Sequence, residues 1–111
     1  MAKNYLEAIE LQSINSTTFT GAYQAINTDG LEHACSILRI VNDSTKDVTI
    51  SYDGVTPHDY IRSGSDLTLN LQANASPNGY VSLVKKGTVV YVSATAGTGY
   101  VYLAGYYNPY I

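Results

Sequence analysis

Hydrophobic and polar residues alternate with a period of two along most of this chain. In Val48–Tyr52 (VTISY) the apolar residues occupy the first, third and fifth positions, and Leu67–Leu71 (LTLNL) repeats the pattern with leucines. Because successive side chains of a strand point to opposite faces, this period predicts β-strands with one buried face. No segment keeps the spacing of three, four and seven residues that an amphipathic helix requires. The pattern therefore predicts an all-β protein.

Turn-forming residues separate the alternating runs at intervals of roughly 8 to 12 residues, which is typical of antiparallel sandwiches. Strands are predicted over residues 21–26, 34–42, 47–52, 67–71, 80–84, 88–95 and 100–107, and turns at Asn27–Gly30, Asp53–Gly54, Asn74–Gly79, Lys85–Gly87 and Ala96–Gly99. We expect an antiparallel β-sandwich of about seven or eight short strands, with jelly-roll or Greek-key connections as the alternatives.

Two pairs of neighbouring strands are predicted to form hairpins. The polar pentamer Asn42–Lys46 separates one pair, and the small residues Ala96–Gly99 separate the two closing strands. The segment 55–65 is predicted to be a loop.

The beginning of the chain allows two interpretations. Leu6–Ile14 is compatible with a helical turn, but Ile9, Leu11 and Ser13 also alternate with polar neighbours as in an opening strand. The domain prediction is accordingly an N-terminal arm or first strand over residues 1–15, followed by one sandwich domain over 16–111. A chain of 111 residues is long enough for one core.

Charge and cysteine content exclude several classes of protein. Charged residues make up 14% of the chain and the net charge is −3, with Lys85-Lys86 as the only adjacent basic pair. A nucleic-acid partner, which requires a basic surface, is therefore not expected, and no apolar run is long enough to span a membrane. The single Cys35 lies in an apolar run and is predicted to be a buried free thiol. So few charges favour association over a monomeric surface of Ser, Thr and Asn.

The polar side chains form no recognisable catalytic or metal-binding pattern. Asp53, His58 and Asp59 lie close together in sequence, but their spacing matches neither an EF-hand nor a zinc site, and a structural loop is predicted. His33 and Cys35 would share one strand face without an acidic partner. Gly97 and Gly99 lack the helix that a phosphate-binding loop requires. We predict a non-enzymatic protein without cofactor or metal.

Tyrosine is the residue that distinguishes the last quarter of the chain. Six of the eleven tyrosines lie there: Tyr91, Tyr100, Tyr102, Tyr106, Tyr107 and Tyr110. Parity places Tyr100, Tyr102 and Tyr106 on one face, and the predicted hairpin brings Tyr91 beside them. The two closing strands are apolar on both faces, so either loops of the same chain or a partner must cover the outer face. These six tyrosines are predicted to form a protein interface, with a sugar-stacking platform as the alternative.

Two segments resemble a known family. VNDSTKDVTISYDGVTPHDYI and KKGTVVYVSATAGTGYVYLAGYY are similar to small β-sandwich virion proteins of tailed bacteriophages, in a likeness that extends from about Ser36 to Tyr107. It consists of a strand ending in Ser-Tyr-Asp-Gly, a His-Asp-Tyr loop and a closing pair of tyrosine-rich strands. It implies a structural component present in many copies and offers no catalytic residues.

The function expected from this resemblance is capsid decoration. A neck or tail accessory component and a carbohydrate-binding module for host attachment are the alternatives. The expected partners are further copies of the chain and other virion proteins, with a glycan only in the last case. The expected location is the virion, after synthesis in the host cytoplasm.

Overall fold

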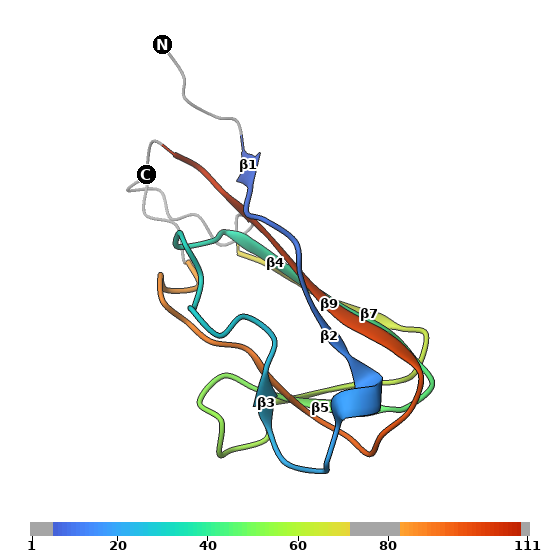
Figure 1. Cartoon of the computed structure of the whole chain (residues 1–111). Helices are drawn as coiled ribbons and strands as arrows, with labels where there is room; N and C mark the ends of the chain where they lie inside the picture. Colours follow the sequence, from blue (N-terminus) through green and yellow to red (C-terminus); the bar gives the residue numbers. More distant parts are fainter. Residues whose placement is uncertain (1–5, 72–82, 110–111) are drawn as a thin grey trace.

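The computed structural model of the chain describes residues 6–71 and 83–109 (Figure 1). These residues form nine strands and one 3-10 turn, η1 (Ser16–Thr18). The strands are β1 (Glu7–Ala8), β2 (Gln12–Asn15), β3 (Gln24–Ala25), β4 (Ile37–Ser44), β5 (Val48–Ser51), β6 (Asp59–Ile61), β7 (Asp66–Asn70), β8 (Tyr91–Ser93) and β9 (Gly99–Tyr107). The predicted turn at Asn74–Gly79 and most of the predicted strand 80–84 lie outside the described residues. No helix within the described ranges has the length and hydropathy needed to cross a membrane.

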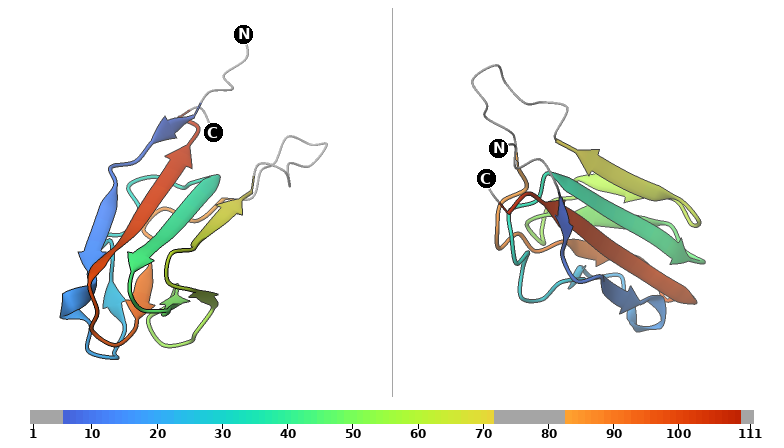
Figure 2. Two further views of the ribbon diagram at one scale, coloured as in Figure 1. Left: turned by 90° about the vertical axis from the view of Figure 1, so that its right-hand side faces the viewer. Right: turned by 90° about the horizontal axis from the view of Figure 1, so that it is seen from above.

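The strands form two antiparallel sheets, which confirms the predicted β-sandwich. The first sheet has the order β1-β9-β4-β7, with β2 also paired to β9, and the second has the order β3-β8-β5-β6. In the left view of Figure 2 the strands of the first sheet lie side by side, from blue through red and green to yellow. We refer to these sheets as sheet A and sheet B.

The pairing of strands is nested, which identifies the topology as a jelly roll. β5 pairs with β6, β4 with β7, β3 with β8, and β1 and β2 with β9. A long antiparallel ribbon rolled around a core gives this order, so that successive strands mostly change sheets. A jelly roll is itself built of two Greek keys, so the observed connections are of the predicted kind.

Both predicted hairpins are wrong, because each pair of strands is divided between the sheets. β4 belongs to sheet A and β5 to sheet B, and the same separation holds for β9 and β8. The first error is explained by the residues Asn42–Ser44, which the polar pentamer predicts as a turn but which continue β4. Asn42 is completely buried within β4, where its Nδ2 donates to the carbonyls of Lys46 (2.8 Å) and Ile61 (3.0 Å). These bonds hold the corner where the chain crosses between sheets.

The predicted loop 55–65 is also corrected, since it contains β6, which pairs with β5. Three of the predicted turns, at Asn27–Gly30, Asp53–Gly54 and Lys85–Gly87, are present: Gly30 N donates to Asn27 O (2.9 Å) at a positive φ of 79°, Gly54 has a φ of 81°, and Thr88 N donates to Lys85 O (3.1 Å). The predicted turn at Ala96–Gly99 is instead part of the crossing from sheet B to sheet A, and Gly99 already belongs to β9.

The opening segment is a strand rather than a helical turn, but it is interrupted by a bulge. Ala8 pairs with Tyr106 and Gln12 with Leu103, so residues 9, 10 and 11 lie opposite only residues 104 and 105. One extra residue shifts the alternation of side chains. The predicted common face of Ile9, Leu11 and Ser13 is therefore wrong: Ile9 packs against the core, whereas Leu11 is 58% exposed.

The core lies between the two sheets and is made by the inward residues of the alternating strands. Its fully buried members include Leu38, Ile40, Val48, Ile50, Val92, Val101 and Leu103. Burying a side chain of this size stabilises the fold by about 1.5–3 kcal/mol. Since these residues fix which side of each strand faces inward, they also fix which residues of sheet A face outward.

Candidate functional site: the outer face of sheet A

Three of the six candidate tyrosines lie in one row on the outer face of sheet A. In β9 the buried positions are Val101, Leu103 and Gly105, so the residues between them point outward. Tyr100 is 42% and Tyr106 37% exposed, and Tyr102 between them is partly exposed. β9 has neighbours on both sides in the sheet, which places the row near the middle of the face.

The register of β4 places a smaller side chain beside each outward tyrosine. Tyr100 lies opposite Asp43, Tyr102 opposite Val41, Ala104 opposite Arg39 and Tyr106 opposite Ile37. On the other side of β9, Asn15 is paired with Tyr100 and Ser13 with Tyr102. We call these outward residues of β9 and β4, together with Asp66, the tyrosine face.

Few charges lie on the tyrosine face, and two of them are paired. Arg39 Nε lies 3.0 Å from Asp66 Oδ2, and both side chains are about half exposed. This bond directs the guanidinium toward β7, away from Ala104 on β9. Tyr100 and Tyr102 stack with ring centroids 6.0 Å apart. Asn15 Nδ2 donates to the hydroxyl of Tyr100 (3.5 Å), which leaves the tyrosine proton available to an acceptor on a partner.

Tyr91 does not belong to the tyrosine face, contrary to the prediction. It lies in β8 of sheet B, opposite Ser51 of β5 and Ala25 of β3. The turn after β5 covers it: a Cβ on Gly54 would lie 3.2 Å from the Tyr91 ring. The predicted alternative, that a loop of the chain itself covers an outer face, therefore holds for β8.

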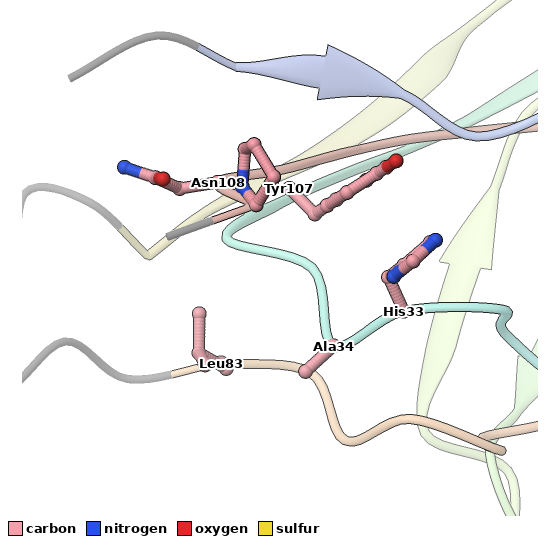
Figure 3. A pocket seen from close by; sticks show the side chains of 6 residues that line it. His33, Ala34, Leu83, Tyr107 and Asn108 are labelled. Atoms are coloured by element: carbon pink, nitrogen blue, oxygen red, sulfur yellow. The ribbon is translucent and has the colours of Figure 1, made fainter. Parts of the chain in front are cut away.

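Tyr107 points away from the other three tyrosines, since its position in β9 has the opposite parity. Its ring stacks on His33 with centroids 3.8 Å apart, and both line a pocket of about 100 Å³ at the end of the sandwich (Figure 3). Its hydroxyl donates to Glu7 Oε2 (3.0 Å), which raises the pKa of Tyr107. This side-chain hydrogen bond links β1 to the end of β9 in addition to the backbone pairing of Glu7 with Tyr107. Tyr110 lies outside the described residues.

The loop that covers Tyr91 is held by its own polar side chains. Asp53 Oδ1 accepts hydrogen bonds from the backbone nitrogens of Val55 and Thr56 (both 2.8 Å) and from Ser51 Oγ (2.8 Å). These hydrogen bonds favour the ionised carboxylate and hold the pKa of Asp53 well below its usual range. The two backbone donors have the largest effect. Asp53 thus serves the loop as a hydrogen-bond acceptor.

His58 and Asp59 both bond to Tyr52. His58 Nδ1 accepts from the Tyr52 backbone nitrogen (3.0 Å), and Asp59 Oδ2 accepts from the Tyr52 hydroxyl (2.7 Å). Burial, reinforced by the bond to Asp59, raises the pKa of Tyr52. In residues 6–71 and 83–109, no cluster of three or more His, Cys, Asp and Glu side chains is suited to a metal ion.

Cys35 and His33 are separated rather than side by side as predicted. Cys35 is completely buried, with its Sγ directed to the carbonyl of His33 (3.4 Å), and burial raises the pKa of its thiol. The His33 side chain is exposed and rests on Tyr107 instead.

Sequence reasoning missed the contribution of β4 to the site. Ile37, Arg39, Val41 and Asp43 alternate with buried residues, so their outward direction could have been inferred from parity. Their position beside β9 could not, because the predicted hairpin assigned β4 a different neighbour.

Comparisons with known proteins give no family for this chain. No family model matches it, and no curated protein matches it. One solved chain, from a structure described as "Bacillus endospore appendages form a novel family of disulfide-linked pili", matches with a TM-score of 0.47 and 19% sequence identity. The match covers 97% of this chain and 94% of that chain. A likeness at this level assigns no function.

Proposed function

We propose that this chain is a non-enzymatic structural protein that assembles through the tyrosine face. The observation that carries the proposal is the row of Tyr100, Tyr102 and Tyr106 on the central part of a sheet face that remains exposed. Tyrosine offers a large, stiff apolar surface with a polar tip, and it is enriched at protein interfaces for this reason. The low charge content of the chain, 14%, favours the same conclusion.

The finer proposal is a place in the virion of a tailed bacteriophage. It rests on the resemblance of the two quoted segments, and it is compatible with the jelly-roll topology, which recurs among viral capsid domains. Capsid decoration is the first choice and a neck or tail accessory the second. The partners are then further copies of the chain or other virion proteins, and the protein is made in the host cytoplasm before it joins the particle.

A carbohydrate-binding role is the runner-up, since jelly rolls also include lectin domains and aromatic rings can stack on sugars. Ligand sites of this kind are usually concave, with a few polar groups directed inward. The three outward tyrosines do not line the His33 pocket, nor the second pocket of about 230 Å³ lined by Gln12, Asn27–Gly30 and Glu32. The geometry of the tyrosine face therefore favours a protein partner.

The test is the substitution Tyr102→Ala, with Tyr60→Ala as its matched control. Tyr60 is 60% exposed but lies on the outer side of sheet B. Truncating an aromatic near the centre of an interface typically costs ~2 kcal/mol or more, which corresponds to about a thirtyfold weaker association. Sedimentation velocity over a concentration series, with and without phage particles, measures this effect.

Tyr102→Ala should shift the protein to the monomer or release it from particles, while Tyr60→Ala associates like the unaltered chain. Equal behaviour of the two variants would refute the proposal. Unchanged association, together with loss of binding on a glycan array in Tyr102→Ala alone, would establish the carbohydrate-binding role instead.

A further inference from the structure

The two central strands of the tyrosine face have complementary outer profiles. Along β9 the outward residues are large, large, small and large: Tyr100, Tyr102, Ala104 and Tyr106. Along β4 the residues opposite them are Asp43, Val41, Arg39 and Ile37. Each tyrosine therefore has a smaller neighbour, and Ala104, the small one of these four residues of β9, has the longest side chain of β4 beside it. By side-chain size, β9 then has a ridge at its tyrosines and a depression at Ala104, and β4 has the reverse profile.

Such a surface matches its own copy under one particular symmetry operation. A two-fold axis parallel to the strands and midway between β9 and β4 places β9 of one copy over β4 of the other. Tyr102 then lies over Val41 of the second copy, and Tyr106 over Ile37. Strand directions stay aligned under this rotation, as they do in ordinary face-to-face packing of sheets about 10 Å apart.

We infer that the partner of the tyrosine face is the same face of a second copy, packed about this two-fold axis. This inference rests on the proposed function and names the partner of the same site. Arg39 is then seated over Ala104 of the other copy. Its guanidinium is already held by Asp66 (3.0 Å), so its aliphatic part is what covers the small residue. The ion pair need not break when the copies meet.

Polar groups at the end of the face are matched by the same operation. Tyr100 lies over Asp43 of the second copy, and its proton is available because its oxygen accepts from Asn15. The Tyr100 hydroxyl can therefore donate to that carboxylate. Asp43 is exposed within one copy, so the contact supplies an acidic group at the rim with a donor.

The area of the face is adequate for a stable pair. β9 has nine residues, so at ~3.3 Å per residue, and with ~4.8 Å of width for each of the four strands across, the outer face of sheet A around the tyrosine face measures at most roughly 30 Å by 19 Å. This flat area of about 600 Å², enlarged by the relief of the side chains, is close to the ~800 Å² per partner of a standard interface. A single sugar ring would leave most of it exposed.

The experiment enlarges one of the two side chains that face each other across the axis and shortens the other. Ala104→Trp fills the depression and should weaken self-association at least tenfold, because the indole meets Arg39 of the second copy. Arg39→Ala leaves a gap and should weaken it by a smaller factor. In an equimolar mixture, a mixed pair restores both contacts, since the indole lies over the shortened side chain and the intact Arg39 lies over the intact Ala104.

Only the mixture is decisive, because Ala104 and Arg39 are also cross-strand neighbours within one chain. The chains carry tags of different mass, sedimentation and native mass spectrometry quantify the mixed pair, and circular dichroism checks that each variant is folded. We expect the mixed pair to be at least tenfold tighter than Ala104→Trp alone. A mixed pair no tighter than Ala104→Trp with itself would overturn the inference. If Tyr102→Ala abolishes association in that case, the proposed function stands and only this partner is wrong.

Discussion

The outer faces of the two sheets use tyrosine in opposite ways. On sheet B, Tyr91 is half-buried beneath the turn at Gly54, whose added Cβ would come within 3.2 Å of the ring. On sheet A, Tyr100 and Tyr106 remain 42% and 37% exposed. The strands that carry them, β8 and β9, are adjacent in sequence and similarly rich in apolar residues. The two faces differ because a loop of the chain packs over Tyr91, whereas Tyr100 and Tyr106 stay exposed.

The covering of sheet B depends on a loop with strong local stabilisation. Ser51 is completely buried at the end of β5, and Asp53 and Gly54 turn the chain back over Tyr91. Such a loop packs on the aromatic side chains of a strand and buries them within the monomer. A tyrosine without such a loop is available to a partner. Whether an aromatic strand is exposed is thus decided by the loop that follows a neighbouring strand.

The largest effect is expected on the stability of the monomer, which should depend on Tyr91 and not on Tyr102. Tyr91→Ala removes an aromatic ring packed beneath a loop, and we expect the free energy of unfolding to fall by about 2 kcal/mol, somewhat less than for a fully buried ring. Tyr102→Ala should change it by less than about 0.5 kcal/mol, as outward surface positions do. Urea unfolding of dilute, dissociated protein measures both. A larger loss in Tyr102→Ala than in Tyr91→Ala would reverse the assignment of the two faces.

A smaller difference, between two glycine variants, should come from the contact of Gly54 with Tyr91. Gly54 and Gly64 have nearly the same φ, 81° and 80°, but only a Cβ on Gly54 meets the Tyr91 ring. Alanine at either position costs about 1–2 kcal/mol for the left-handed conformation. Gly54→Ala should lose roughly 1 kcal/mol more than Gly64→Ala, because the loop or the Tyr91 ring must shift by a few tenths of an ångström to admit the Cβ. Equal losses in urea unfolding would indicate that the loop does not press on Tyr91.

Acid should destabilise the loop that covers Tyr91, because this loop depends on the Asp53 carboxylate. The lowered pKa of Asp53 means that its carboxylate stabilises the fold above the usual aspartate pKa, near 4, and that this contribution is lost as the pH falls below it. Asp53→Asn lacks this titration. The decrease in unfolding midpoint between pH 7 and pH 3 should therefore be smaller in Asp53→Asn than in the unaltered chain. An identical decrease in both proteins would show that the ionised Asp53 side chain does not stabilise the loop.

The smallest effect is expected from the exposed tyrosine of sheet B. The Tyr60 hydroxyl donates to Asp47 Oδ2 (2.7 Å), and this bond raises the pKa of Tyr60. Tyr60→Phe removes only a solvent-exposed hydrogen bond, so neither the unfolding midpoint nor the sedimentation coefficient should change measurably. A clear loss of association in Tyr60→Phe would show that sheet B also contacts a partner.

Local features of this protein follow from its sequence alone. Period-two alternation identified the strands around Ile50 and Leu69 and their buried sides, parity put Tyr100, Tyr102 and Tyr106 on one face of the last strand, and the turn residues identified the positive φ at Gly54. The burial of Cys35 followed from its apolar neighbours. Each of these depends on a few adjacent residues, because backbone sterics and side-chain parity act over that distance.

Which strands are neighbours depends on long-range contacts in the folded chain. A polar connection such as Asn42–Lys46 permits a hairpin or a crossing between sheets, and the choice depends on Asn42 reaching the carbonyl of Ile61 (3.0 Å), nineteen residues away. The same kind of long-range pairing put Tyr91 under Gly54 and placed β4 beside Tyr102. One extra residue opposite Ala104 and Gly105 reversed the direction of Leu11. Parity states which side of a strand is buried, whereas the fold selects the strand or loop that lies beside it.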